Sequence, residues 1–223
     1  MSAVLGSQPL VDVDWITRNL DDIWAATVVH ARFTVIPVLA GLAIAFPLSL
    51  VAVRYPRLYG PLLGVAGLLY TIPSFALFVL LLPFFGLNDL PVLVALTIYT
   101  LLILIRNTVE GLAGVSRDVV ESADAMGYRP SARLLRVELP IATPVIVAGL
   151  RIATVSTVGL VAVGALLGFE RGGYGAFFLD GYARDFFTPQ LVGIVGCVAL
   201  AVVLDLALLA LQRGLTPWTR VAR

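Results

Sequence analysis

The chain has 223 residues, 60% of them hydrophobic and 13% charged, with a formal net charge of +1 and a mean hydropathy of +0.99. Soluble domains average about 45–50% apolar and about 25% charged residues, so a water-soluble fold is excluded and the chain is expected to lie in a lipid bilayer. The balanced charge excludes a nucleic-acid partner, and one cysteine with one histidine excludes a disulfide framework and a metal cluster.

The first 30 residues are predicted to be an extracytoplasmic segment that ends in an amphipathic helix. Five large apolar residues recur there at helical spacing: Trp15, Ile16, Leu20, Ile23 and Trp24. Tryptophan is enriched at membrane interfaces, so this helix is expected at the outer membrane surface. It either packs on the outer ends of the membrane helices or takes part in docking a partner.

Five apolar stretches are long enough to cross about 30 Å of hydrocarbon, which takes about 20 helical residues. They cover about 31–53, 61–84, 91–109, 141–168 and 189–212. Each must be helical, because an unpaired backbone amide in lipid is costly. Four prolines lie inside these spans or near their starts: Pro37, Pro47, Pro73 and Pro144. The predicted fold class is an all-α membrane protein, with five kinked transmembrane helices packed into one bundle over 31–213.

The distribution of arginines predicts the orientation of the bundle. Ten arginines lie in 54–60, 106–139 and 213–223, whereas the segments on the opposite side hold four arginines and eight acidic residues. Positive charge is retained in the cytoplasm, so the N-terminus is expected outside and the tail 214–223 in the cytoplasm. The polar segment 111–139 then lies on the cytoplasmic side of the membrane.

This cytoplasmic segment is predicted to form two short helices around a break. Gly127 suits the left-handed turn that ends the first helix, and Pro130 suits the first turn of the second. Small side chains at Ala123 and Ala125 are expected to let a partner surface approach closely, with Glu121 pairing across that contact. On residue types alone, an ordinary amphipathic loop between two spans is the alternative.

One pattern in the segment closely resembles the EAA loop of ABC-importer permeases. It consists of Glu121-Ser122-Ala123, then Gly127, then Val137-Glu138-Leu139-Pro140, with Ser122 where alanine is commoner. In that family the loop is a pair of cytoplasmic helices that docks into a cleft on an ATPase subunit. The resemblance implies that 111–139 is a coupling segment and that seven of its residues, or of those next to it, couple this chain to an ATPase: Glu121, Ser122, Ala123, Asp124, Gly127, Leu139 and Pro140.

Three further stretches resemble the osmoprotectant permeases, the importers of glycine betaine, carnitine and choline. They are Tyr70-Thr71-Ile72-Pro73-Ser74-Phe75-Ala76-Leu77, Arg106-Asn107-Thr108 in the segment that begins at Tyr99, and Gly172-Gly173-Tyr174-Gly175. Phe75 departs mildly from the family pattern, where leucine is commoner. The resemblance covers about residues 30–213. It implies a type I ABC-importer permease (MetI-like) fold with a coupling-helix loop.

The same resemblance implies the partners of the chain in the bacterial cytoplasmic membrane. These are two ATPase subunits, a second permease copy or a paralogue, and an extracytoplasmic substrate-binding protein. No cofactor is expected on this chain, because ATP and Mg would be bound by the ATPase, and no Walker-type loop occurs here. The implied substrates are glycine betaine, choline, carnitine or proline betaine. An amino-acid or methionine importer is the alternative, because those permeases share the EAA loop.

Two charged residues lie inside predicted spans. Arg151 and Asp205 each sit roughly 12–15 Å from the cytoplasmic face, at 1.5 Å per helical residue. Charges within the membrane usually pair or face a cavity. An ion pair that locks the fourth and fifth spans is predicted; binding of a cationic substrate by Asp205, and pairing with other polar groups or water, are the alternatives.

Six residues near the middle of the second and third spans are candidates for a substrate pathway: Tyr70, Thr71, Pro73, Ser74, Phe75 and Tyr99. A proline frees a backbone carbonyl, hydroxyls are small and polar, and aromatic rings attract methylated amines. Helix packing explains the same residues, because hydroxyls and small residues are common between membrane helices.

The glycine- and phenylalanine-rich outer loop 169–188 is predicted to be a plain interfacial loop, or a short helix along the outer surface that closes the outer mouth or meets the binding protein. Arg106 and Asn107 are expected to cap the third span or to tie it to the coupling segment. Two other function classes fit the sequence less well. A secondary transporter would show inverted repeats or acidic relays, and a membrane enzyme would need a reactive cluster that His30 alone does not supply.

Overall fold

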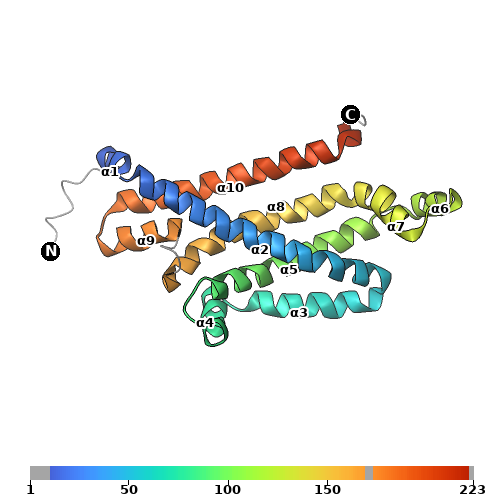
Figure 1. Ribbon diagram of the computed structural model, residues 1–223, viewed down its shortest axis with the longest axis horizontal. Helices are drawn as coiled ribbons and strands as arrows, with labels where there is room; N and C mark the ends of the chain where they lie inside the picture. Colours follow the sequence, from blue (N-terminus) through green and yellow to red (C-terminus); the bar gives the residue numbers. More distant parts are fainter. Residues whose placement is uncertain (1–10, 169–172, 221–223) are drawn as a thin grey trace.

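The computed structural model describes residues 11–168 and 173–220, and every regular element in these ranges is helical (Figure 1). The longer helices are α2 (Leu20–Arg54), α3 (Tyr59–Thr71), α4 (Ser74–Phe85), α5 (Leu90–Ala113), α8 (Leu139–Gly164) and α10 (Phe187–Leu215). The short ones are α1 (Val13–Arg18), α6 (Arg117–Ala125), α7 (Pro130–Arg133) and α9 (Tyr174–Ala183). A π-helical segment, η2 (Leu134–Glu138), joins α7 to α8, and single 3₁₀ turns occur at Pro56–Leu58, Ala165–Leu167 and Pro217–Arg220.

Four continuous helical runs in the described chain are long and apolar enough to cross a membrane: Leu20–Arg54, Leu90–Ala113, Pro130–Leu167 and Phe187–Leu215. The pair formed by α3 and α4 is a fifth candidate, but it bends by 97° at its break. In Figure 1, α1 and α9 lie at one end of the bundle and α6 and α7 at the opposite end, on the side of the C-terminus. The bundle therefore separates a polar end that carries the coupling segment from an end that carries α9.

The stretch 61–84, expected as one kinked span, forms two helices that meet at a bend of 97°. The helix stops at Thr71, and Ile72 and Pro73 are extended, with ψ of 128° and 134°. Proline causes this break, because it lacks a backbone N–H and disfavours helical geometry in the residue before it. The freed carbonyl of Ile72 accepts a hydrogen bond from the Tyr99 hydroxyl of α5, so the break is satisfied inside the protein.

The amphipathic helix expected before the first span is mostly part of that span. α1 covers six residues and ends at Asn19, whose backbone N–H and side chain both bond back to α1. α2 then begins at Leu20 and runs without a break for 35 residues. Trp15 on α1 packs edge-on against Phe177 of α9 and against Phe186, which lies just before α10.

The core of the bundle is formed by α2, α5 and α8, with α3 and α4 packed on α5 and α10 packed on α8 and α9. One cluster of buried residues lies around the break: Phe33, Leu77, Phe78, Val92, Ala95, Leu96, Tyr99 and Val161. A second lies nearer the coupling segment: Ala45, Ala52, Leu104, Ile105, Val109 and Ala153. α10 is peripheral, since only four of its 29 residues are buried: Thr188, Pro189, Gly193 and Leu200.

α9 fills the place of the predicted outer loop and is anchored by His30 of α2. The His30 Nε2 bonds to the Val158 carbonyl of α8 at 2.9 Å, and its Nδ1 accepts from the Tyr174 backbone N–H at 3.3 Å. One buried ring thus joins three helices, and α9 is the short helix expected as one of the two alternatives for 169–188. Gly172 of the glycine motif lies outside the described residues.

Small residues set the close approach of α5 and α8. A Cβ at Gly149 would lie 2.6 Å from Cγ of Asn107, too close for any real contact, and one at Gly111 would lie 3.1 Å from the Ala142 carbonyl. Asn107 also donates to the Ile103 carbonyl at 2.8 Å, so it is tied to its own helix and to α8. Asn107, expected to cap the third span or to tie it to the coupling segment, contacts Ile103 and Gly149 instead.

This packing predicts that Gly149→Ala will lower the thermal stability of the purified protein. Forcing a methyl group into a filled contact costs about 1–3 kcal/mol. Gly159→Ala is the matched control on the same helix, because no atom lies within 4 Å of the added Cβ there. The measurement is thermal unfolding in detergent. Equal melting temperatures for the two variants would contradict the tight α5–α8 contact.

Candidate functional site

The first helix of the coupling segment, α6, is closed at both ends by local hydrogen bonds. Ser116 caps its start by accepting from the Asp118 backbone N–H at 3.3 Å. At its end Gly127 has φ of +80°, and its N–H bonds to the Asp124 carbonyl at 2.9 Å. The Tyr128 N–H bonds to the Ala123 carbonyl at 3.1 Å. These two bonds form a Schellman motif, in which the left-handed residue is usually glycine.

The second helix of the segment is continuous with a membrane span. Pro130 occupies the first helical position of α7, as expected from its fixed φ and missing N–H. The helix then widens into the π turn of η2 and continues as α8. The Leu139 N–H bonds to the Leu134 carbonyl across this turn, five residues back. α7, η2 and α8 therefore form one continuous helical rod.

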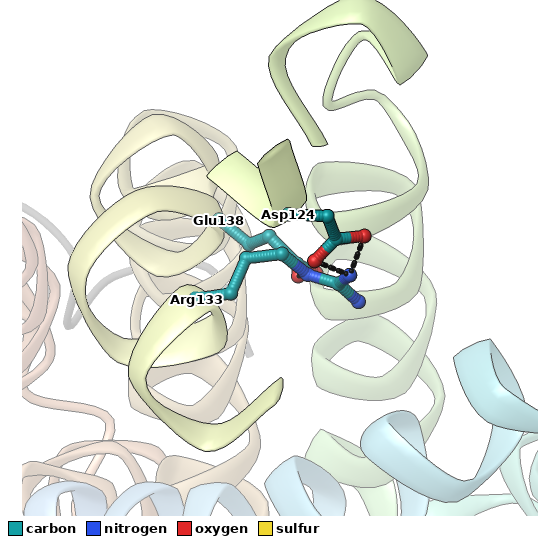
Figure 2. Close-up of polar contacts among 3 residues, drawn as sticks. All are labelled: Asp124, Arg133 and Glu138. Carbon is teal, nitrogen blue, oxygen red and sulfur yellow. Dashed lines mark hydrogen bonds and ion pairs between the residues drawn. The ribbon is translucent and has the colours of Figure 1, made fainter. Parts of the chain in front are cut away.

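Arg133 holds the segment together by bonding to two carboxylates (Figure 2). Its Nη1 donates to both oxygens of Asp124 at 2.7 and 2.6 Å, and its Nε donates to Glu138 Oε1 at 2.7 Å. Hydrogen bonds to Glu138 and then to Asp124 raise the pKa of the Arg133 guanidinium above its ordinary value. Sequence reasoning missed this arginine; the signal was its place five residues before Glu138 and seven before Pro140.

The predicted coupling residues differ in what they present to a partner. Glu121 and Ser122 are exposed on α6, and Met126 beside them is 70% exposed. Among the described residues no side chain forms an ion pair with Glu121. The expectation that Ala123 provides a close contact surface is wrong, because the segment itself buries Ala123 to 1% exposure. Its small size lets α6 pack on its own loop, and Ala125 remains exposed.

The other members of the predicted set lie inside the segment. Both carboxylate oxygens of Asp124 are bonded to Arg133, so Asp124 braces the loop although half of its side chain is exposed. Leu139 and Pro140 are partly buried at the start of α8. The structure thus separates an outward face, with Glu121, Ser122 and Met126, from an internal brace.

The structure brings the two intramembrane charges together. The Nε of Arg151 on α8 lies 2.7 Å from Asp205 Oδ1 on α10, and its Nη2 lies 2.7 Å from Oδ2. Such a two-pronged pair is the geometry that a guanidinium and a carboxylate favour. The pair joins α8 to α10 through two residues that are 54 positions apart in the sequence.

The candidate pathway residues surround the break between α3 and α4. Tyr70 and Phe75 are 40% and 43% exposed on either side of it, and Thr71 and Pro73 between them are also exposed. Ser74 is partly buried at the start of α4.

Tyr99, the sixth candidate pathway residue, is buried and does not contribute to this exposed surface. It is 5% exposed, packs edge-on against Tyr70 with ring centroids 5.6 Å apart, and bonds to the carbonyl freed at the break. Its place is explained by the need to satisfy that carbonyl in an apolar environment.

Arg106, which lies further along α5, donates a hydrogen bond to Glu110 one turn beyond it at 2.9 Å. Arg106 therefore stabilises its own helix rather than tying it to the coupling segment.

Comparison with known proteins identifies the family to which this chain belongs. A family described as "Binding-protein-dependent transport system inner membrane component" matches residues 37–221. The chain is similar to the Choline transport system permease protein OpuBB of Bacillus subtilis (strain 168). The two are 32% identical over 207 residues, which cover 92% of this chain and 94% of that protein. The Osmoprotectant import permease protein OsmW of Salmonella typhimurium (strain LT2) is 35% identical over 210 residues, covering 92% and 97%.

A solved structure shares the fold. A chain of the MetNI methionine ABC transporter in an inward-facing conformation superposes with a TM-score of 0.73, at 20% identity, over 92% of this chain and 100% of that chain. At that identity the likeness concerns the fold alone. The family match spans the coupling segment, the charge pair and the broken span. The chain therefore belongs to the family of binding-protein-dependent transport system inner membrane components, with the fold of the type I ABC-importer permeases.

Proposed function

We propose that this chain is the membrane permease subunit of an ATP-driven importer for quaternary amines. The observation that carries the proposal is α6, a short exposed helix that ends in a glycine turn and is braced onto the same rod as span α8. A partner that moved α6 would move a transmembrane helix. The chain itself supplies no nucleotide-binding loop, so ATP with Mg would be bound and hydrolysed by separate ATPase subunits.

The assembly proposed is two ATPases, two permease chains and an extracytoplasmic binding protein. One bundle of this size exposes much of its apolar surface, and a second permease copy or paralogue would complete an enclosed pathway. With the positive charges retained in the cytoplasm, α6 and the C-terminus would face the ATPases and α9 would face the binding protein. Within the chain, 1–30 would be extracytoplasmic, 31–213 the permease domain and 214–223 the cytoplasmic tail.

The substrate class is proposed from two lines of support. The relatives named above are a choline permease and an osmoprotectant permease. The exposed rings of Tyr70 and Phe75 flank the break between α3 and α4, and aromatic faces attract quaternary ammonium groups. We therefore propose glycine betaine, choline, carnitine or proline betaine as the transported class, with a path past Tyr70, Thr71, Pro73, Ser74 and Phe75.

The test is uptake by proteoliposomes that contain the purified complex and its binding protein. We expect ATP-dependent accumulation of radiolabelled choline, carnitine or betaine, and no accumulation with a non-hydrolysable ATP analogue. Methionine and a polar amino acid are the matched substrates for the alternative importer class. Uptake of methionine alone would replace the substrate proposal. Uptake by this chain alone without ATP would replace the importer with a secondary transporter.

A further inference from the structure

α6 is attached to the membrane helices by one short link and by side-chain bonds to α7. α6 packs mainly on α7 and η2. Its covalent link to α7 is the short stretch 126–129, in which Gly127 has the left-handed conformation. The Schellman hydrogen bonds close α6 on itself and do not reach α7. The side-chain bonds that do cross from α6 to the rod formed by α7, η2 and α8 are those between Asp124 and Arg133.

Arg133 suits this position because its donors form a planar fork. Its Nη1 donates to both oxygens of Asp124 and its Nε donates to Glu138, so a single rigid group holds two carboxylates that would otherwise repel. Such charge-assisted hydrogen bonds are the stronger kind in proteins. Glu138 is mostly covered, with 13% of its side chain exposed, and it immediately precedes the first residue of α8. The fork therefore connects α6 to the start of the span.

The π turn makes this connection possible. In an α-helix with 3.6 residues per turn, residues five apart point about 140° away from each other. A π turn is bonded from each residue to the fifth one along, which brings Arg133 and Glu138 to the same side. The cause in the sequence is Pro140, which cannot donate to the Arg136 carbonyl and whose ring would press against it. The Leu-Pro pair that ends the EAA-like pattern thus shapes the turn that the fork needs.

We propose that Arg133 is a positioning residue that makes α6 and α8 move as one body, so that ATPase motion at α6 reaches the membrane span. The inference rests on the proposed function and adds a residue outside the EAA-like pattern to the coupling path. Without the fork, α6 would swivel about the Gly127 link while α8 stayed in place. Hydrolysis of ATP would then continue with little import.

The test uses the reconstituted complex with wild-type chain, Arg133→Gln, Asp124→Asn and the double variant. We expect ATPase subunits to co-purify with all four and hydrolysis to continue. Substrate imported per ATP should fall by about tenfold in each single variant, within the 5–150-fold range typical of coupling between sites. The double variant should be no worse than either single one, because both remove one device. Arg133→Lys, which keeps the charge but loses the fork, should recover part of the ratio.

Arg57→Gln is the control for loss of a cytoplasmic arginine outside the coupling segment, and we expect it to keep the wild-type ratio. An unchanged ratio in Arg133→Gln would overturn the proposal. Loss of the ATPase subunit together with transport in both single variants would also overturn it, since Arg133 would then serve docking alone. Failure of the proposed function looks different, because the wild-type complex itself would show no ATP-dependent uptake.

Discussion

Asp205→Ala is expected to remove most of the folded protein from the membrane. The substitution leaves Arg151 without the carboxylate that now bonds to two of its nitrogens at 2.7 Å. An unpaired arginine near the centre of a span costs about 2.5–3.5 kcal/mol on insertion scales, so we expect folded protein to fall by about tenfold or more. The measurement is the amount of monodisperse protein extracted by a mild detergent, together with its melting temperature.

A double variant separates a structural pair from a substrate-binding carboxylate. Arg151→Leu with Asp205→Leu removes both charges, and replacing a charge pair by apolar residues is often neutral or stabilising. We expect it to restore the protein level and to retain transport. Normal protein level with lost uptake in Asp205→Ala, not rescued by the double variant, would contradict the lock between α8 and α10. That result would instead place Asp205 in the path of a cationic substrate.

Gly127→Pro is expected to abolish transport while leaving the membrane helices folded. Proline fixes φ near −65°, whereas Gly127 has φ of +80° and donates its N–H to the Asp124 carbonyl. The change removes the turn that ends α6 and costs about 3 kcal/mol locally. Because α6 lies outside the bundle, the melting temperature of the chain should change little. The measurements are ATP-dependent uptake and co-purification of the ATPase.

Gly127→Asn is the matched control, because asparagine tolerates the left-handed conformation and no atom lies within 4 Å of the added Cβ. We expect it to keep most of the transport activity. Equal loss in the asparagine and proline variants would show that the contact surface rather than the turn matters. Wild-type uptake by the proline variant would contradict the role given to α6.

The coupling segment shows how far local sequence rules carry. The turn at Gly127 and the start of α7 at Pro130 follow from backbone preferences of single residues, and both are present in the structure. The burial of Ala123 was not predictable in this way, because it depends on how α6 folds back onto η2. The role of Arg133 was hidden for a related reason. A spacing of five residues places side chains together only in a π turn, and helical periodicity assumes 3.6 residues per turn.

The membrane region shows a similar division. Hydropathy located the apolar stretches, and the rarity of charge in lipid singled out Arg151 and Asp205, which the structure brings together. Hydropathy does not register direction, so it gave no measure of the 97° bend between α3 and α4, although Pro73 indicated a kink at this position. The place of Tyr99 followed from that bend, since its hydroxyl bonds to the carbonyl that the bend exposes.

The most direct test of the account is to identify what contacts α6 in the native membrane. A photo-crosslinking amino acid would be placed at Ser122, which is exposed on α6, and in a second variant at Tyr182, which is 83% exposed on α9 at the opposite end. Mass spectrometry would then identify the captured subunit. If α6 docks on an ATPase, position 122 captures an ATPase subunit and position 182 does not. Capture of an ATPase at 182 but not at 122, or ATP-independent uptake by a chain that captures none, would contradict it.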